Sequence, residues 1–132
     1  MIECPRLVGR YVTVYLKGAL KVLQLCEVQV FEPCDESCYN LALYQPSTKT
    51  GGAAYPDAAT DGNPNTNYFG HSCALLGGGA KDPFFTLDLG HVTKVGKVRL
   101  WYSGDCGYCP YMLDKFQVRF GMDANGMGNP VR

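Results

Sequence analysis

The fold is decided by the stretch Arg10-Tyr11-Val12-Thr13-Val14-Tyr15-Leu16. Polar or aromatic residues alternate here with apolar ones, and most of the side chains are β-branched or aromatic, a composition that packs well on a pleated surface. Alternation of this kind over about four to eight residues is typical of a half-buried strand. We therefore predict a strand over residues 10–16.

The same signals recur along the rest of the chain. They predict further strands at residues 22–31, 40–44, 82–90, 94–103 and 116–121. Helix signals are nearly absent, whereas 16 glycines and 8 prolines interrupt the chain every few residues. Polar segments at 32–39 and 50–67 are expected to be a linker and a long loop. About seven short strands with turns between them predict an all-β domain of the β-sandwich or jelly-roll kind.

Residues 22–31 (VLQLCEVQVF) contain one acid at an unusual place. As a single alternating strand, this segment puts Leu23, Leu25, Glu27 and Gln29 on one face. Glu27 then falls among apolar residues. An acid in that setting is either solvated at a strand edge or is a ligand for a cation.

Size and charge exclude several classes of function. A chain of 132 residues fits one domain, residues 1–132. Twelve basic and twelve acidic residues give a net charge of zero without a basic stripe, so nucleic acid is not an expected partner. No apolar run approaches the roughly 20 residues that cross a bilayer. No Ser-His-Asp or Cys-His order has a usable context, and residues 77–79, expected as a glycine loop, lack the lysine of a phosphate cradle. We do not expect an enzyme.

Cysteine usage points to an oxidising compartment. There are seven cysteines, at positions 4, 26, 34, 38, 73, 106 and 109. Such a density with glycine-rich loops predicts disulfides and a secreted protein. The alternative is a zinc site made by Cys34, Cys38, Cys106 and Cys109, although zinc folds keep their cysteine pairs much closer together. Met1 is not followed by a signal peptide, so the start is either processed or cut, or the chain is cytosolic.

Two blocks of sequence resemble the F-type lectins, a family of fucose-binding proteins. One block is residues 9–16 (GRYVTVYL) running into 25–30 (LCEVQV). The other comprises residues 40–43 (NLAL), 57–63 (DAATDGN), 67–73 (NYFGHSC), 83–90 (PFFTLDLG), 103–106 (SGDC) and 129–130 (NP). The resemblance covers nearly the whole chain and implies an F-type lectin-like β-sandwich, of the galactose-binding-domain-like kind.

The order of the two blocks is reversed relative to that family. Residues 1–31 are equivalent to the family's C-terminal strands, and residues 40–132 to its N-terminal and central part, with 32–39 as the linker between them. One interpretation is a circular permutant that folds on itself, as close termini allow. In the other, the segment straddles two tandem repeats, and its first strands complete a neighbouring domain. In both, the resemblance leaves Cys4 without its partner.

The resemblance implies a structural calcium ion. Its ligands would be the side chains of Glu27, Asp61 and Ser72 and main-chain oxygens at Ala58 and Asn63. A Cys26–Cys73 disulfide would hold the two segments together at the ion. These are the hard oxygen ligands that calcium takes. The alternative is an ordinary turn in which Asp61 and Asn63 bond to their own backbone.

The family's sugar site is altered in this chain. The matching positions for its histidine and first arginine are Leu75 and Ser103, and the second basic position falls at Pro110 or Met112. Asp105 is retained, while the family's adjacent cysteines become Cys106 and Cys109, for which we expect a disulfide. Losing three donors to sugar hydroxyls should abolish ordinary fucose affinity. A further expected disulfide is Cys34–Cys38.

An aromatic rim could take over the altered site. It comprises His71, Trp101, Tyr102, Tyr108, Tyr111 and Met112. Aromatic faces stack on sugars and also form protein-binding hot spots, but several of these residues fit the core equally well. The sequence therefore predicts a secreted glycan-binding module with calcium and an altered fucose site. The alternative is a structural or interaction domain without sugar binding that assembles by strand exchange or disulfides.

Overall fold

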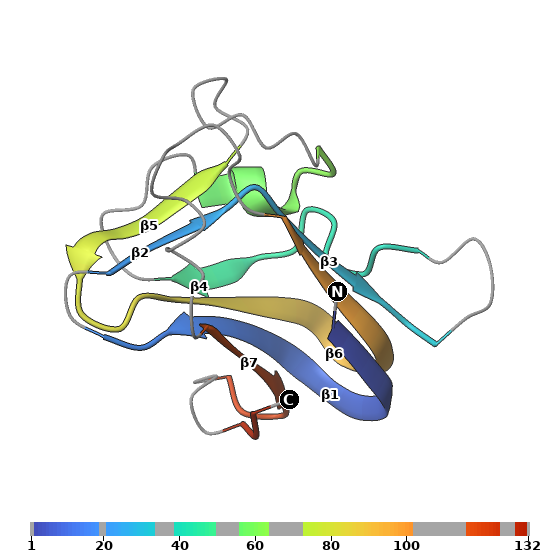
Figure 1. The fold of residues 1–132 in the computed structure, drawn as a ribbon. Coiled ribbons are helices and arrows are strands. Elements are labelled where there is room, and N and C mark those ends of the chain that lie inside the picture. The colour runs from blue at the N-terminus through green and yellow to red at the C-terminus, as the bar shows by residue number, and fades with distance from the viewer. Residues whose placement is uncertain are drawn as a thin grey trace.

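The computed structural model describes residues 2–18, 21–33, 39–49, 56–63, 73–101, 116–124 and 129–131. These residues form antiparallel strands and one short 3-10 helix, which confirms the predicted all-β class (Figure 1). The elements are β1 (Ile2–Leu16), β2 (Lys21–Leu25), β3 (Glu27–Phe31), β4 (Ser47–Lys49), η1 (Pro56–Thr60), β5 (Ala74–Ala80), β6 (Phe84–Trp101) and β7 (Phe116–Gly121).

The larger sheet is built around two long strands, β1 and β6. Its order is β3-β6-β1-β7. The short strand β4 pairs with Phe85–Leu87 of β6, on the edge of β6 opposite to β1. The β1–β6 register shifts between Glu3 and Leu7 and again between Gly9 and Tyr11, so the pair bends along its length. β2 and β5 form a separate two-stranded sheet, which lies above β1 and β6 in Figure 1.

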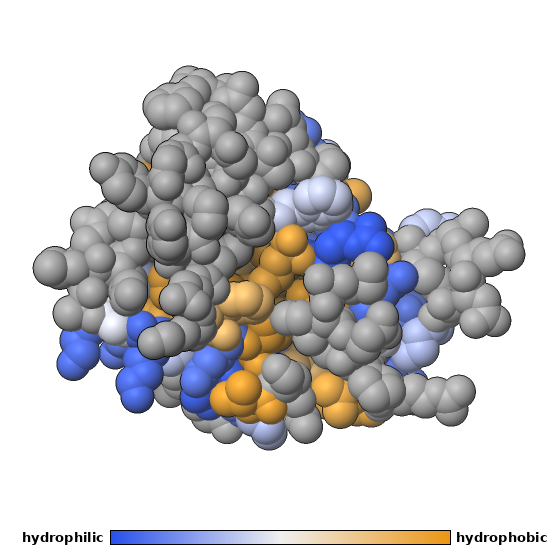
Figure 2. Space-filling view, viewed as in Figure 1, coloured by the Kyte–Doolittle hydropathy of each residue, from blue (hydrophilic) through white to orange (hydrophobic). Residues whose placement is uncertain are grey.

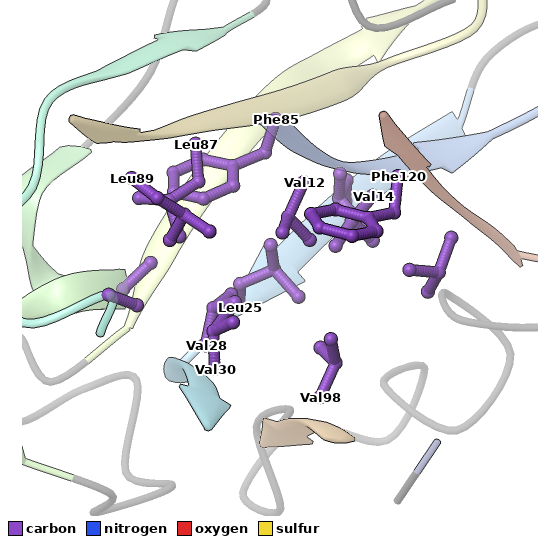
Figure 3. Close-up of a cluster of buried hydrophobic side chains, with 14 of the residues drawn as sticks. Val12, Val14, Leu25, Val28, Val30, Phe85, Leu87, Leu89, Val98 and Phe120 are labelled. Carbon is purple, nitrogen blue, oxygen red and sulfur yellow. The ribbon is translucent and has the colours of Figure 1, made fainter. Parts of the chain in front are cut away.

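Apolar side chains from both sheets meet in one core. The residues that supply it include Val12, Val14, Leu23, Leu25, Val28, Val30, Phe85, Leu87, Val98, Val118 and Phe120. Figure 3 shows side chains of β1, β6 and β7 converging on those of β2 and β3. Figure 2 shows apolar residues along the middle of one face, with hydrophilic residues toward its edges. The arrangement is sandwich-like, since each sheet buries one face against the other.

The predicted strand over residues 22–31 is broken in two, and the prediction of its faces is wrong. Leu23 and Leu25 are buried in β2, but in β3 the core residues are Val28 and Val30. Odd-numbered residues face the core before Cys26 and even-numbered residues face it afterwards. The N–H of Cys26 donates to the carbonyl of Trp101 at 2.7 Å. At this corner the chain leaves the smaller sheet and enters the larger one, and alternation alone cannot reveal such a switch.

Other boundaries also differ from the sequence predictions. Residues 82–90 and 94–103 were expected to form two strands, but β6 runs through Gly90, which has a φ of 89°. Residues 77–79 lie in β5 rather than in a loop. Within the predicted strand 40–44, Asn40 makes a single bridge to Phe31 and a turn follows. Its side-chain oxygen accepts the N–H groups of Val30 and Ala42, which favours the turn over a strand.

The predictions for residues 10–16 and 116–121 are confirmed. The first segment lies within β1, and the second is β7, which pairs with it from Tyr11–Gly121 to Leu16–Phe116. Gly9 and Gly121 allow a close approach where these strands cross. A Cβ on Gly9 would lie 2.8 Å from the carbonyl oxygen of Gly121.

Candidate functional site

Glu27 is the most unusual residue of the described part of the chain. It begins β3 and has no exposed surface. Neither carboxylate oxygen has a hydrogen-bond partner among the described residues. Leaving a buried charge unpaired is costly, so either the group is protonated or something compensates it.

The pKa of Glu27 reflects this setting. It is raised from 4.5 to about 8, chiefly by burial and in addition by repulsion from the neighbouring carboxylate of Asp61. The backbone amides of Gly62 and Val28 oppose this rise, but neither reaches the carboxylate in a geometry that counts as a hydrogen bond. The carboxylates of Glu27 and Asp61 are therefore close enough for their charges to repel each other.

The segment that carries Asp61 is held in place by its own contacts. η1 packs against β3 and β5, and the carbonyl of Thr60, its last residue, accepts the N–H of Tyr44 at 2.7 Å. Asp61 Oδ1 accepts the N–H of Asn63 at 2.9 Å. This is the turn considered as the alternative to a metal site, and it is present. It occupies one site on one oxygen of Asp61, whereas a carboxylate can accept at about four.

Gly62 completes this turn, because its φ of 83° is one that side chains with a Cβ rarely adopt. A Cβ there would also lie 2.9 Å from Cδ1 of Leu43. Any other residue at position 62 would therefore strain the turn that follows η1.

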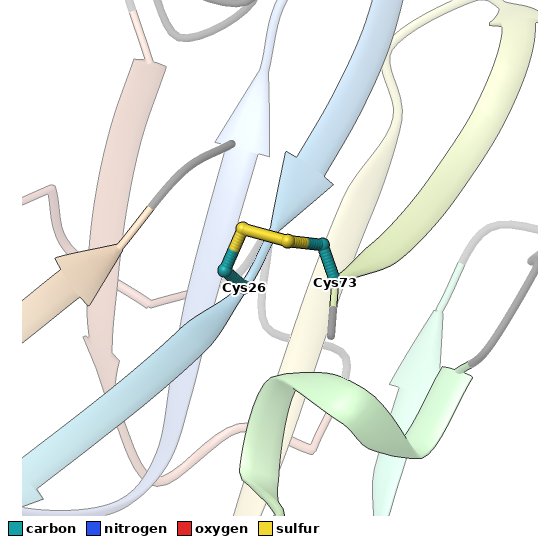
Figure 4. Close-up of a disulfide and its surroundings, with 2 residues drawn as sticks. All are labelled: Cys26 and Cys73. Carbon is teal, nitrogen blue, oxygen red and sulfur yellow. A yellow bond between two sulfur atoms is a disulfide. The ribbon is translucent and has the colours of Figure 1, made fainter. Parts of the chain in front are cut away.

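The expected disulfide between Cys26 and Cys73 is present, with an S–S distance of 2.05 Å. It joins the corner before β3 to the residue before β5, next to η1 (Figure 4). Because Cys26 precedes Glu27, the bridge fixes the backbone beside the buried carboxylate. Ser72, the neighbour of Cys73 in sequence, lies outside the described residues.

The other predicted ligands can be placed only in part. Ala58 is buried in η1, Asn63 is exposed, and Leu75 is half-buried in β5 opposite Gln24. Outside the described residues lie His71, Ser103, Asp105, Cys106, Tyr108, Cys109 and Met112, and with them the expected pairs Cys106–Cys109 and Cys34–Cys38. Within the described ranges, no three His, Cys, Asp or Glu side chains gather into a group that could hold a metal ion.

The donor set that is described fits a hard cation. Glu27 and Asp61 offer two carboxylates that interact with each other, and carboxylate oxygens are ligands that calcium takes. A calcium ion would compensate the buried charge of Glu27 and the repulsion from Asp61 together. Cys26 and Cys73 are used by their disulfide, so these two sulfurs are not available to a softer metal.

Sequence reasoning missed a second polar region, on the outer side of β1, β4 and β6. A hollow of about 200 Å³ there is lined by Tyr11, Pro46, Ser47, Thr86, Asp88 and Ala124. A neighbouring hollow of about 380 Å³ is lined by Tyr44, Gln45, Pro46, Asp57, Thr60 and Asp61. The signal available in the sequence was Pro46, which marks a break in regular structure but does not show which residues gather around it.

An ion pair stabilises the first of these hollows. Arg10 donates from Nε and Nη2 to the two carboxylate oxygens of Asp88, at 2.7 and 3.0 Å. The N–H of Gly90 donates to Asp88 Oδ1 at 2.8 Å. The hydrogen bond from Arg10 is the main reason why the pKa of Asp88 is lowered. Asp88 is therefore an ionised and oriented acceptor.

Comparisons with known proteins add no relative. No protein-family model matches the chain, and neither a curated protein nor a solved structure matches it. In the described part of the chain, no helix is long and apolar enough to span a membrane. Functional inference therefore rests on the residues of this chain.

Proposed function

We propose that this chain is a secreted, calcium-stabilised, lectin-like binding domain related to the F-type lectins in circularly permuted order. The observation that carries the proposal is Glu27, a buried carboxylate without a described partner, beside Asp61 and the Cys26–Cys73 disulfide. The sequence resemblance placed all four of these residues at one ion.

Calcium would act on structure rather than on a reaction. Bound between Glu27 and the η1 turn, it would supply the positive charge that both carboxylates lack. It would tie the segment carrying η1 to β3 and to the start of β5. Ligands from Ser72, Ala58 and Asn63 complete the proposed set.

Two contacts support the permuted order. The bridge between Phe31 and Asn40, with the N–H of Leu41 donating to the carbonyl of Val30 at 2.7 Å, brings the two ends of the linker 32–39 side by side. A short linker can therefore join what would be the family's two termini. In addition, β1 pairs with β6 on one side and β7 on the other, within one chain. This pairing favours a domain that folds on itself over one whose first strands complete a neighbour.

Calcium-dependent unfolding tests this proposal. In calcium at about a hundredfold excess over Kd, the midpoint of thermal unfolding should rise on the order of 10 °C above its value in EDTA. Glu27→Gln should remove most of this rise, because the amide cannot supply the charged ligand. In EDTA the same variant should be at least as stable as the parent, since it removes a carboxyl group that the folded protein must otherwise protonate or bury without a compensating charge.

A matched control is Glu32→Gln, which removes an acid from an exposed position after β3 and should keep the full response to calcium. A parent protein that unfolds at the same temperature in calcium and in EDTA would contradict the calcium site. Magnesium should act weakly, because the proposed set relies on several fixed protein oxygens and magnesium retains its water.

The loss of the family's three sugar donors favours a second candidate, a structural domain without sugar binding. The apolar Leu75 stands where the family has its histidine, and Ser103 where it has an arginine. A glycan array separates the two candidates. A calcium-loaded protein that binds no glycan, but forms oligomers as its concentration rises, would establish the structural role.

A further inference from the structure

We propose that the chain binds a neutral oligosaccharide in the groove on either side of Pro46, rather than at residues 103–112, to which the family resemblance assigns the sugar. This inference rests on the proposed lectin-like function and assigns that function a different site. The groove consists of the two hollows described above, both of which are lined by Pro46.

The first half of the groove, at Asp88, is rigid and has mixed polarity. Tyr11 and Asp88 come from paired positions of β1 and β6, and Ser47 and Thr86 from β4 and β6. Strands hold side chains more firmly than loops do, so this half needs little ordering on binding. Its volume of about 200 Å³ is enough for a single pyranose ring.

The charges in this half favour hydroxyl groups over a cation. Asp88 already pairs with the guanidinium of Arg10, so its negative charge is compensated. The carboxylate keeps further acceptor sites, and Arg10 supplies donors next to them. A sugar hydroxyl both donates and accepts, and an Arg–Asp pair beside a tyrosine ring offers partners for both. Lysine or arginine side chains of a peptide would instead need an uncompensated acid.

The second half of the groove repeats the same combination of an aromatic ring and an acid. Tyr44 is 76% exposed, and its backbone has a φ of 58°, which is uncommon for a side chain of this size. The hydrogen bond from its N–H to Thr60 holds the residue at the rim. The exposed Asp57 provides the acceptor, because Asp61 is assigned to calcium. An exposed ring fixed beside an acceptor is a platform for the apolar face of a sugar.

The two halves together indicate the length of the ligand. Each offers one tyrosine and one acid, and Pro46 separates them with a side chain that has no hydrogen-bonding group. One sugar ring on each side of Pro46 would use both sets of partners. A chain of two or more sugars should therefore bind at least about tenfold more tightly than either sugar alone.

The experiment uses the full chain in calcium on an array of neutral oligosaccharides one to five sugars long. The best-bound oligosaccharide is then titrated by calorimetry against the parent protein, Tyr44→Ala and Asp57→Asn. Each variant should weaken binding about tenfold, the usual scale for one aromatic platform or one charged acceptor. Tyr39→Ala is the matched control, because Tyr39 is 79% exposed but does not line the groove. It should bind within about twofold of the parent.

A calcium-dependent thermal midpoint equal to that of the parent checks that each variant is folded. If Tyr44→Ala and Asp57→Asn bind like Tyr39→Ala while Tyr108→Ala loses binding, the groove is wrong and the lectin-like function stands. If the parent binds no glycan, both the groove and the sugar-binding function are wrong. Binding of pentalysine with no array signal would also overturn the groove, because it would show that the acids select a cation.

Discussion

Glu27 and Asp88 are both carboxylates on strands of the same sheet, yet their surroundings are opposite. Asp88 is partly exposed, pairs with Arg10 and has a lowered pKa. Glu27 is fully buried, has no described partner and has a raised pKa. The negative charge of Asp88 is compensated by Arg10 of the same chain, whereas the carboxylate of Glu27 needs a proton or a cation. A buried acid is therefore informative about function only after its partners have been counted.

The largest expected effect comes from removing the link that holds the Glu27 region together. The double variant Cys26→Ala, Cys73→Ala opens a crosslink between positions 47 residues apart. It should lose about 2–5 kcal/mol of unfolding free energy, as removal of a native disulfide typically does. Urea denaturation in calcium measures this loss. The calcium response should weaken as well, because the backbone beside Glu27 is no longer tied to β5.

The control for this experiment is reduction of the parent protein with dithiothreitol, which should lower its stability at least as far as in the double variant, because it also opens the other two expected disulfides. A double variant that keeps both the parent's stability and its calcium response would show that the bridge is not needed for the Glu27 region.

The next effect is on the pH dependence without calcium. The raised pKa means that the folded protein holds the Glu27 proton more tightly than the unfolded chain does. In EDTA, stability should therefore fall as the pH rises from about 4.5 to about 8, and level off above that. The slope should not exceed about 1.4 kcal/mol per pH unit. Denaturation curves at several pH values measure it.

Two controls sharpen this prediction. Glu27→Gln in EDTA should lack the decline between these pH values, and so should the parent protein in saturating calcium, where the carboxylate is compensated. Identical pH profiles for the parent and the variant in EDTA would show that Glu27 does not titrate in this range.

The smallest effect is expected at Asp88. Its lowered pKa adds stability above the ordinary carboxyl pKa, and this stability is lost as the pH falls through the lowered value. Asp88→Asn should therefore lower the thermal midpoint slightly at pH 7 and hardly at all at pH 3. The effect is small because the pair is partly exposed and is screened by solvent. A larger fall in the thermal midpoint for Asp88→Asn than for Glu27→Gln in calcium would reverse the comparison between the two regions.

The sequence predicted the strand at residues 10–16 and the all-β class because alternation directly reports a half-buried strand. It could not predict the change of face at Cys26. One residue at a corner between two sheets inverts the pattern, and the pattern on each side of that corner is equally regular. The sequence also predicted two strands in place of β6, because a glycine such as Gly90 often marks a turn. Long-range pairing with β1 continues the strand through this position.

For the site, the sequence supplied the side chains but not their burial. Glu27 was left open between a solvated edge and a cation ligand, and its complete burial decides against the solvated edge. Pro46 gave no indication of a groove, because Tyr44 and Asp88 are brought together with the other lining residues only by the fold. Exposed and buried tyrosines look alike in a sequence.

The central position of β1 has a consequence for synthesis. Arg10 and its partner Asp88 are 78 positions apart, and the other neighbour of β1, β7, is made later still. During translation the segment 10–16, rich in β-branched and apolar residues, therefore remains unpaired until β6 and β7 have been synthesised. A segment of this composition is prone to aggregate while it waits. The yield of folded protein should therefore depend on how fast the ribosome delivers β6 and on chaperones that cover β1 until then.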